Sequence, residues 1–240
     1  MVKTFLHSGK LGDIIWALPV IKYLGGGKLY IKPNEWDGAE LKLSTDFALS
    51  ILPLLNEQEY IHGAELYGGQ HIDYDLNQFR NVIFRYQGIS ITKSVFLGLG
   101  ITDNVSEYID TPWLKVDKDP NVIDKIVVSR TGRYLSGREH INKFYLILKE
   151  RGLSKHGVFV GSESEYESFE NIYKTEIPYY KTSSILDLAK VVSASKFYVG
   201  NENLTNAINE GLKKVSFLER NLNPPAQSFC IFNRPDQFII

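Results

Sequence analysis

The sequence predicts an α/β fold in which two Rossmann-like domains, each with a doubly wound parallel sheet, face a cleft. Three observations predict it. In the second half of the chain, short apolar segments typical of buried strands alternate with amphipathic segments of about ten residues. Residues 2–31 have the pattern of a strand, a helix and a strand, and the crossover of such a unit implies parallel pairing. The length of 240 residues has room for two small domains.

Composition excludes several classes of protein. An apolar content of 43% with 12% aromatic residues is enough to bury a core, which excludes global disorder. The 27 basic and 28 acidic residues give a net charge of −1, so no basic surplus indicates a nucleic-acid partner. Cys230 is the single cysteine, and no apolar run reaches the length of a membrane span or resembles a signal peptide. We therefore expect a cytoplasmic location.

The first domain is expected over residues 1–115. A strand over Val2–Leu6 leads into a glycine-containing turn. A helix then begins near Asp13 and has apolar residues at three- and four-residue steps, the pattern of one face packed on a sheet. Three glycines at 25–27 end it, and Lys28–Ile31 forms the next strand.

The rest of this domain has weaker patterns. We expect a helix over Thr45–Leu55, a strand over Val82–Arg85 and a helix over Ser90–Leu99. Residues 110–121 contain two prolines and little periodicity, which is typical of a connection between domains.

The second domain is expected over residues 122–220, where the patterns are clear. The predicted strands are Ile126–Ser129, Val158–Val160, Phe197–Val199 and Val215–Leu218, and the predicted helices are Ile141–Arg151, Ser164–Tyr173, Ser184–Ser193 and Asn203–Leu212. Residues 221–240 contain three prolines and are expected to form an extended tail that can cross back to the first domain.

Three strand-to-helix loops carry residues suited to chemistry, because ligands of such folds bind at the carboxyl ends of parallel strands. The first loop is Ser8-Gly9-Lys10-Leu11-Gly12-Asp13. Its two glycines allow the backbone to approach a ligand, and the alternative is that Gly12 makes the turn while Asp13 caps the helix. Neither the dinucleotide fingerprint nor the P-loop pattern is present.

The second loop, Ser129–Tyr134, contains Arg130 and Arg133 around a glycine. Two arginines at a strand end suit a diphosphate, and the alternative is a solvated basic loop. The third loop runs from Gly200 to Thr205. Its amide and carboxylate side chains suit ribose hydroxyls, and the helix N-terminus after it suits phosphate; capping by Asn201 or Asn203 is the alternative.

The motif Gly12-Asp13-Ile14-Ile15-x-x-Leu18-Pro19, together with Gly200-Asn201-Glu202-Asn203 and a following helix, resembles the family-9 glycosyltransferases. These are the ADP-heptose:lipopolysaccharide heptosyltransferase-like proteins of GT-B fold. The order of the elements between the two motifs also fits. The resemblance covers most of residues 1–30 and 122–219, and residues 33–115 have no match.

The resemblance implies transfer of a sugar from a nucleotide-diphosphate-sugar co-substrate to a glycan or other hydroxyl acceptor, without a metal or a further cofactor. Asp13 takes the place of the family's proposed catalytic base, and Arg130 that of its diphosphate contact, with Arg133 beside it. The candidate donor-binding residues are Ser129, Arg130, Arg133, Gly161, Asn201, Glu202, Asn203 and Thr205. The candidate acceptor-side residues are Ser8, Gly9, Lys10 and Gly12. No two of the five histidines have the spacing of metal ligands on a helix, and no metal site is expected.

The sequence also departs from the family. Glu202 stands where the family has Asp, no glycine follows it, and Asn206 or Ala207 takes the place of a histidine. These changes argue against ADP-heptose as the donor. The alternatives are a non-catalytic nucleotide- or glycan-binding protein on the same scaffold, and another GT-B-like enzyme, either an epimerase or a phage DNA-base glycosyltransferase.

Overall fold

The computed structural model describes residues 2–34, 43–83, 89–132, 142–219, 230–232 and 234–240. The chain divides into two compact units, which are treated separately below. The first unit comprises Met1–Lys115, Ser184–Leu186 and Gly211–Lys213, and the second comprises Val116–Ser183, Asp187–Glu210 and Lys214–Ile240.

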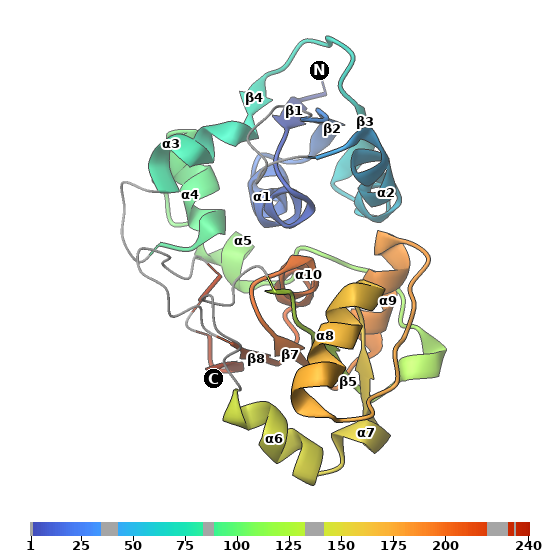
Figure 1. Cartoon of the computed structure of the whole chain (residues 1–240). Coiled ribbons are helices and arrows are strands. Elements are labelled where there is room, and N and C mark those ends of the chain that lie inside the picture. The colour runs from blue at the N-terminus through green and yellow to red at the C-terminus, as the bar shows by residue number, and fades with distance from the viewer. Residues whose placement is uncertain (1, 35–42, 84–88, 133–141, 220–229, 233) are drawn as a thin grey trace. The chain divides into compact units, whose positions relative to one another are not determined.

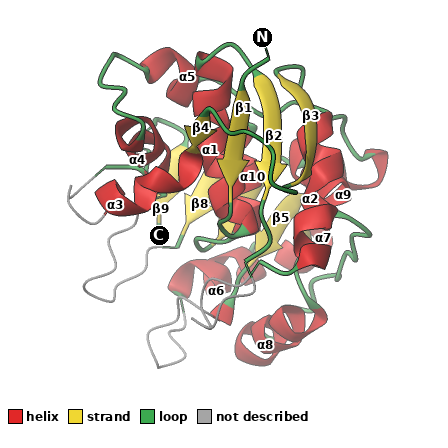
Figure 2. Ribbon diagram, turned by 90° about the horizontal axis from the view of Figure 1, so that it is seen from above, coloured by secondary structure: helices red, strands yellow, loops and turns green. Residues whose placement is uncertain are grey.

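The first unit contains a parallel sheet of four strands in the order β3-β2-β1-β4 (Figure 2). Its strands are β1 (Thr4–His7), β2 (Gly27–Ile31), β3 (Ile61–Leu66) and β4 (Tyr74–Asp75). The predicted parallel pairing of the first two strands is confirmed, with a register from Thr4 opposite Lys28 to His7 opposite Ile31. β4 lies on the other side of β1.

Helix α1 begins earlier and is more deeply buried than its pattern predicts. The helices of this unit are α1 (Leu11–Tyr23), α2 (Thr45–Asn56), the 3₁₀ helix η1 (Leu76–Phe79), α3 (Arg80–Ile83), α4 (Ile91–Gly98) and α5 (Ser106–Asp110). All residues from Ile14 to Ile21 are buried rather than one face alone. The reason is that α2, α4 and α5 all contact α1.

The structure of the middle of this unit differs from the expectation. Val82 and Ile83 end the helix α3 instead of forming a strand, and residues 84–88 lie outside the described part. The strands β3 and β4 were not predicted. β3 has the sequence IHGAEL, in which a histidine, a glycine and a glutamate interrupt the apolar pattern, and β4 has only two residues.

The second unit contains a parallel sheet of five strands in the order β6-β5-β7-β8-β9. Its strands are β5 (Ile126–Ser129), β6 (Gly157–Phe159), β7 (Phe197–Gly200), β8 (Ser216–Leu218) and β9 (Gln237–Ile239). All four predicted strands are present, with ends that differ by at most one residue. Their apolar runs are short and nearly continuous, as expected for strands buried on both faces.

The helices of the second unit cover this sheet. They are the 3₁₀ helix η2 (Pro120–Val122), α6 (Lys143–Glu150), α7 (Leu153–His156), α8 (Glu163–Tyr173), α9 (Ile185–Ala194) and α10 (Leu204–Gly211). The short helices α6 and α7 follow one another along the chain (Figure 1). An aromatic core joins helices to strands, since Tyr145 of α6 and Phe169 and Tyr173 of α8 pack with Val128 and Val199.

The described part of the tail belongs to the second unit. β9 pairs in parallel with β8, from Ser216 opposite Gln237 to Leu218 opposite Ile239. The described part of the tail therefore extends the second sheet, and its crossing back to the first domain stays a prediction. The physical reason is that β8 offers an unpaired edge whose backbone groups β9 satisfies.

Candidate functional sites at the ends of the two sheets

Each sheet gathers its candidate residues at one edge. Because all strands of a sheet are parallel, the loops that leave their carboxyl ends lie along the same side of it. In the first unit these are the loops after β1 and β4, and in the second the loops after β5, β6, β7 and β8.

Asp13 lies in the first turn of α1, and it is not the residue that caps the helix. Lys10 takes the N-cap position with an extended backbone, and Asp13 is the third helical residue. An oxygen of its carboxylate accepts the backbone N–H of Lys10 at 3.3 Å. Its side chain is 24% exposed, so the carboxylate is placed by the backbone and still reaches solvent. The N-terminal end of the helix favours its negative charge.

The other residues of this loop hold the backbone in place. The backbone N–H and the hydroxyl of Ser8 both donate to Asn77 Oδ1 at 2.9 Å. The N–H of Gly9 donates to His7 Nδ1 at 2.9 Å. Gly12 lies within α1 rather than in a turn.

Gly9 is required at its position by close packing. A Cβ at Gly9 would lie 2.5 Å from His7 Cε1, 2.8 Å from Arg80 Nη2 and 2.9 Å from the Cβ of Asp13. The side chains of His7, Arg80 and Asp13 therefore converge on this glycine. Arg80 follows β4 and was not predicted as part of the site, because nothing in the local sequence indicates its proximity to the first loop.

His7 is a fully buried histidine at the end of β1. Burial, and second the positive charge of Arg80, lower its pKa to about 3. Since Nδ1 accepts the N–H of Gly9, the proton of the neutral ring is on Nε2, which has no hydrogen-bond partner among the described residues. His7 is therefore a neutral, structural imidazole at physiological pH.

We predict that His7 contributes to acid denaturation. The unfolded chain binds a proton near the ordinary pKa of 6.5 and the folded chain only at about 3, so stability is lost as pH falls between these values. Between these two values the free energy of unfolding falls by about 1.4 kcal/mol for each unit by which the pH is lowered. His7→Asn should flatten this part of the curve in urea denaturation followed by tryptophan fluorescence. His62→Gln, at an exposed site on β3, is the control, and an unchanged slope in His7→Asn would contradict the prediction.

In the second unit, Ser129 is the centre of a polar network. Its hydroxyl accepts Asn203 Nδ2 at 3.0 Å and the hydroxyl of Thr205 at 3.2 Å. Ser129 and Thr205 are buried. The network joins the end of β5 to the first turn of α10.

Asn201 and Asn203 have different roles in this network. Asn203 caps α10, because its Oδ1 accepts the N–H of Asn206 at 3.0 Å. The amide of Asn201 instead pairs with the backbone of Thr131, accepting its N–H at 3.1 Å and donating to its carbonyl at 2.7 Å. Asn201 thus continues the pairing of β5 and β7 beyond the last residues of the two strands.

Gly200 allows the strands to approach closely at this point. A Cβ at Gly200 would lie 2.0 Å from the carbonyl oxygen of Ser129 and 2.2 Å from the hydroxyl of Tyr198. That hydroxyl donates to the carbonyl of Asn201 at 2.9 Å. A larger residue at 200 would separate the two loops that the network joins.

Arg130 forms a buried ion pair. Its Nε and Nη2 donate to the two carboxylate oxygens of Glu219 at 2.7 and 2.8 Å, and the Arg130 side chain is only 3% exposed. Burial by itself lowers the pKa of Arg130, but the hydrogen bonds and the charge of Glu219 outweigh it, and the pKa is raised. Arg130 is therefore buried rather than part of a solvated basic loop, and its contact with a diphosphate stays a prediction. Glu219 was not predicted, and its partner lies 89 residues away in the chain.

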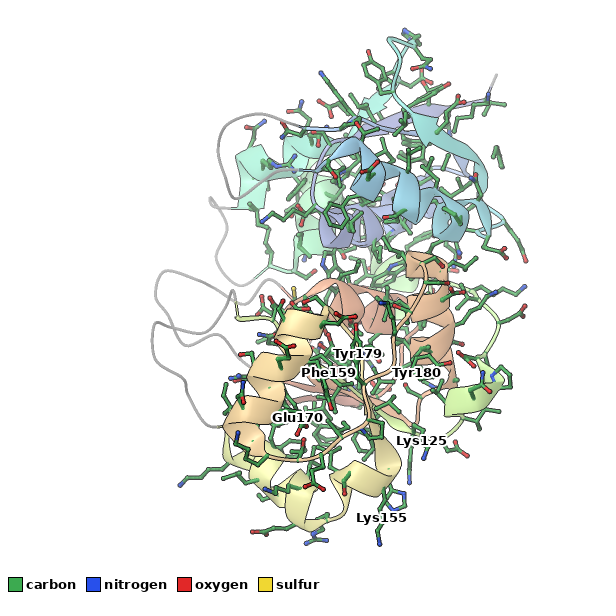
Figure 3. All side chains as sticks on the ribbon, turned by 45° about the vertical axis from the view of Figure 1, so that its right-hand side comes forward. Lys125, Lys155, Phe159, Glu170, Tyr179 and Tyr180 are labelled. Carbon is green, nitrogen blue, oxygen red and sulfur yellow. The ribbon has the colours of Figure 1, made fainter. Side chains whose placement is uncertain are left out.

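Gly161, after β6, has a backbone conformation that favours glycine, with φ of +145°. Its carbonyl accepts the hydroxyl of Tyr179 at 2.9 Å. Figure 3 shows Tyr179 and Tyr180 close to Phe159, whose carbonyl accepts the N–H of Tyr180 at 2.8 Å. Glu165 forms the capping box of α8 with Ser162. The loop after β6 is thereby fixed on both sides.

The remaining predicted residues are Glu202 and Arg133, and the positions where the family has a histidine are Asn206 and Ala207. Glu202 is half-buried at the start of the third loop, and Arg133 lies outside the described residues. Asn206 and Ala207, where the family has a histidine, are both buried. Within the described part of the chain, no group of three metal-binding side chains occurs, and no helix is long and apolar enough to span a membrane.

Solved structures of glycosyltransferases have the same fold. The glycosyl transferase family 9 protein from Veillonella parvula is 10% identical, with a TM-score of 0.65 over 99% of this chain and 84% of that chain. The E. coli heptosyltransferase WaaC with ADP is 10% identical, with a TM-score of 0.61 over 100% of this chain and 92% of that chain.

The iron-containing dodecameric glycosyltransferase TibC from enterotoxigenic E. coli is 14% identical, with a TM-score of 0.63 over 98% of this chain and 61% of that chain. The chain has the fold of these glycosyltransferases. The predicted α/β class with two parallel sheets is therefore confirmed. No family model matches the sequence, and no curated protein matches it. At such identities the likeness extends to the fold, and the function has to be argued from the sites.

Proposed function

We propose that the protein is a glycosyltransferase that moves a sugar from a nucleotide-diphosphate-sugar donor to a hydroxyl group of an acceptor. The observation that carries the proposal is a partly exposed carboxylate, Asp13, in the first turn of the helix that follows the first strand, in a chain whose whole length follows the fold of such enzymes. The solved structures include the E. coli heptosyltransferase WaaC with ADP and the same enzyme with ADP-2-deoxy-2-fluoro heptose, which supports a nucleotide-sugar donor.

The donor is proposed to bind at the carboxyl edge of the second sheet. The N-terminus of α10 offers a helix dipole to the diphosphate, and Asn201 holds the loop Ser129–Gly132 beside it through the backbone of Thr131. Glu202 is the proposed contact to the ribose hydroxyls, and Asn203 orders the turn beside it. In this proposal Arg130 holds the loop through Glu219 instead of contacting phosphate directly.

The acceptor is proposed to bind beside Asp13 in the first unit. The acceptor oxygen attacks the anomeric carbon of the donor sugar and forms the new glycosidic bond. The bond between that carbon and the diphosphate oxygen breaks, and the nucleoside diphosphate leaves with the electron pair. The Asp13 carboxylate takes the proton of the acceptor hydroxyl, which general-base catalysis requires.

A thermal-shift panel of nucleotide-diphosphate sugars tests the proposal. A donor present at 100 times its dissociation constant should stabilise the folded protein by about 2.7 kcal/mol, which raises the melting temperature by several degrees. The matching nucleoside and sugar 1-phosphate serve as controls. Release of nucleoside diphosphate in the presence of acceptor then reports transfer, with and without a chelator. A panel in which no member raises the melting temperature would contradict the proposal.

A further inference from the structure

The segment that joins β4 to α3 reaches the start of α1. β4 pairs with β1 in parallel, with Tyr74 opposite Phe5 and Asp75 opposite Leu6, so the chain leaving β4 lies beside the chain leaving β1. The carboxylate of Asp75 accepts the backbone N–H and the side-chain Nδ2 of Asn77, at 3.0 and 2.6 Å. These two bonds orient the amide of Asn77, so that its Oδ1 is left as an acceptor.

That single oxygen connects the two loops. Asn77 Oδ1 accepts the N–H and the hydroxyl of Ser8, and it also accepts Arg80 Nη1 at 2.8 Å. The Arg80 guanidinium lies 4.7 Å from the ring centroid of Phe79, a cation–π contact that limits its movement further. Arg80 is therefore held by neighbours on its own segment and placed against the first loop.

The contact of Arg80 with Asp13 is close but not a hydrogen bond. Arg80 Nη2 lies 3.8 Å from Asp13 Oδ2, with 29% and 24% of the two side chains exposed. At this distance the charge favours the ionised carboxylate, while no N–H of the guanidinium occupies its oxygen. The neighbouring imidazole of His7 is neutral, and Lys10 lies at the N-cap of the same helix.

We propose that Arg80 is a positioning residue for Asp13, with its guanidinium held beside the Asp13 carboxylate through the chain Asp75–Asn77–Arg80. The proposal rests on the proposed role of Asp13 as the base. It adds to that role a cation from a distant part of the sequence, and it explains why Gly9 leaves room for the guanidinium beside the carboxylate.

The first test needs no substrate. The carboxyl ¹³C signal of Asp13, assigned with Asp13→Asn, is followed by NMR as a function of pH in the wild type, Arg80→Gln and Arg80→Lys. Loss of the adjacent positive charge should move the titration midpoint of Asp13 upward by about one pH unit in Arg80→Gln. In Arg80→Lys the titration midpoint of Asp13 should lie close to its wild-type value, because the positive charge is retained. Arg151→Gln removes an exposed arginine of the second unit and should leave the midpoint in place.

A midpoint that does not move in Arg80→Gln overturns the proposal. If Arg80→Gln no longer melts cooperatively, Asn77→Ala is measured in its place, because this variant removes the Oδ1 atom that accepts the Arg80 hydrogen bond. We then expect a smaller upward shift of the Asp13 titration midpoint. A midpoint that does not move in Asn77→Ala overturns the proposal. With a donor from the panel, Arg80→Gln should lower kcat about tenfold at unchanged donor KM, and Arg80→Lys should restore it. Absence of transfer in every variant and the wild type contradicts the proposed function, and the NMR titration still decides the role of Arg80.

Discussion

Asp13→Asn is expected to lower the rate of sugar transfer by about 10²–10⁴ while the protein stays folded and binds its donor. The amide oxygen of asparagine can still accept the N–H of Lys10, so the first turn of α1 keeps its hydrogen bond. The amide cannot take a proton from an acceptor hydroxyl, and loss of a general base typically has an effect of this size. The lost charge at the helix terminus should reduce the free energy of unfolding by about 0.3–1 kcal/mol, which lowers Tm by a few degrees at most.

The matched control is Asp46→Asn. Asp46 is also an aspartate in the first turn of a helix of the first unit, and it is exposed. Asp46→Asn should change neither the rate of sugar transfer nor the affinity for the donor. Near wild-type transfer by Asp13→Asn would mean that Asp13 only stabilises the first turn of α1 through its hydrogen bond with the N–H of Lys10. A wild-type protein that binds a nucleotide sugar and never transfers it would favour the alternative of a non-catalytic binding protein.

Arg130→Ala is expected to lower the free energy of unfolding of the second unit by about 3–5 kcal/mol. The substitution leaves the carboxylate of Glu219 buried without its cation, and breaking a buried ion pair in this way has that cost. It also removes the tie between the ends of β5 and β8. Tryptophan fluorescence does not report this loss well, because all three tryptophans lie in residues 1–115. Hydrogen exchange of the amides of β5 and β8, measured by mass spectrometry, is the suitable measurement.

The double variant Arg130→Met with Glu219→Leu separates folding from binding. It removes both charges and should recover most of the lost stability. Arg151→Ala, at an exposed arginine, should change stability by less than about 0.5 kcal/mol. If the double variant keeps its donor affinity, Arg130 acts by holding the loop. If its affinity falls tenfold or more at recovered stability, Arg130 contacts the diphosphate. A loss below about 1 kcal/mol in Arg130→Ala would contradict the structural role of the pair.

The second unit shows how much of the fold local sequence predicts. β5 and β7 are short apolar runs, each followed by a polar loop and a helix, and both were predicted within one residue. Each of these strands can be recognised from its own residues, because a strand that is buried on both faces is apolar along nearly its whole length. β3, which has a histidine, a glycine and a glutamate, lacks such a signal and becomes a strand only because β2 offers it a partner.

The same distinction between local sequence and tertiary structure applies to the candidate site residues. The sequence by itself determined that Asp13 lies near the start of the helix that follows the first strand, and that Ser129, Asn201 and Thr205 lie where a strand leads into a helix, because chain order and periodicity specify these places. Only the tertiary structure decided which charged side chains lie next to one another. Arg130 is held by Glu219, and Arg80 lies beside Asp13, because parallel pairing brings together strand ends that are far apart in sequence. A charged side chain has no local signal for its partner, since the same residue is solvated or buried according to what the fold places opposite it.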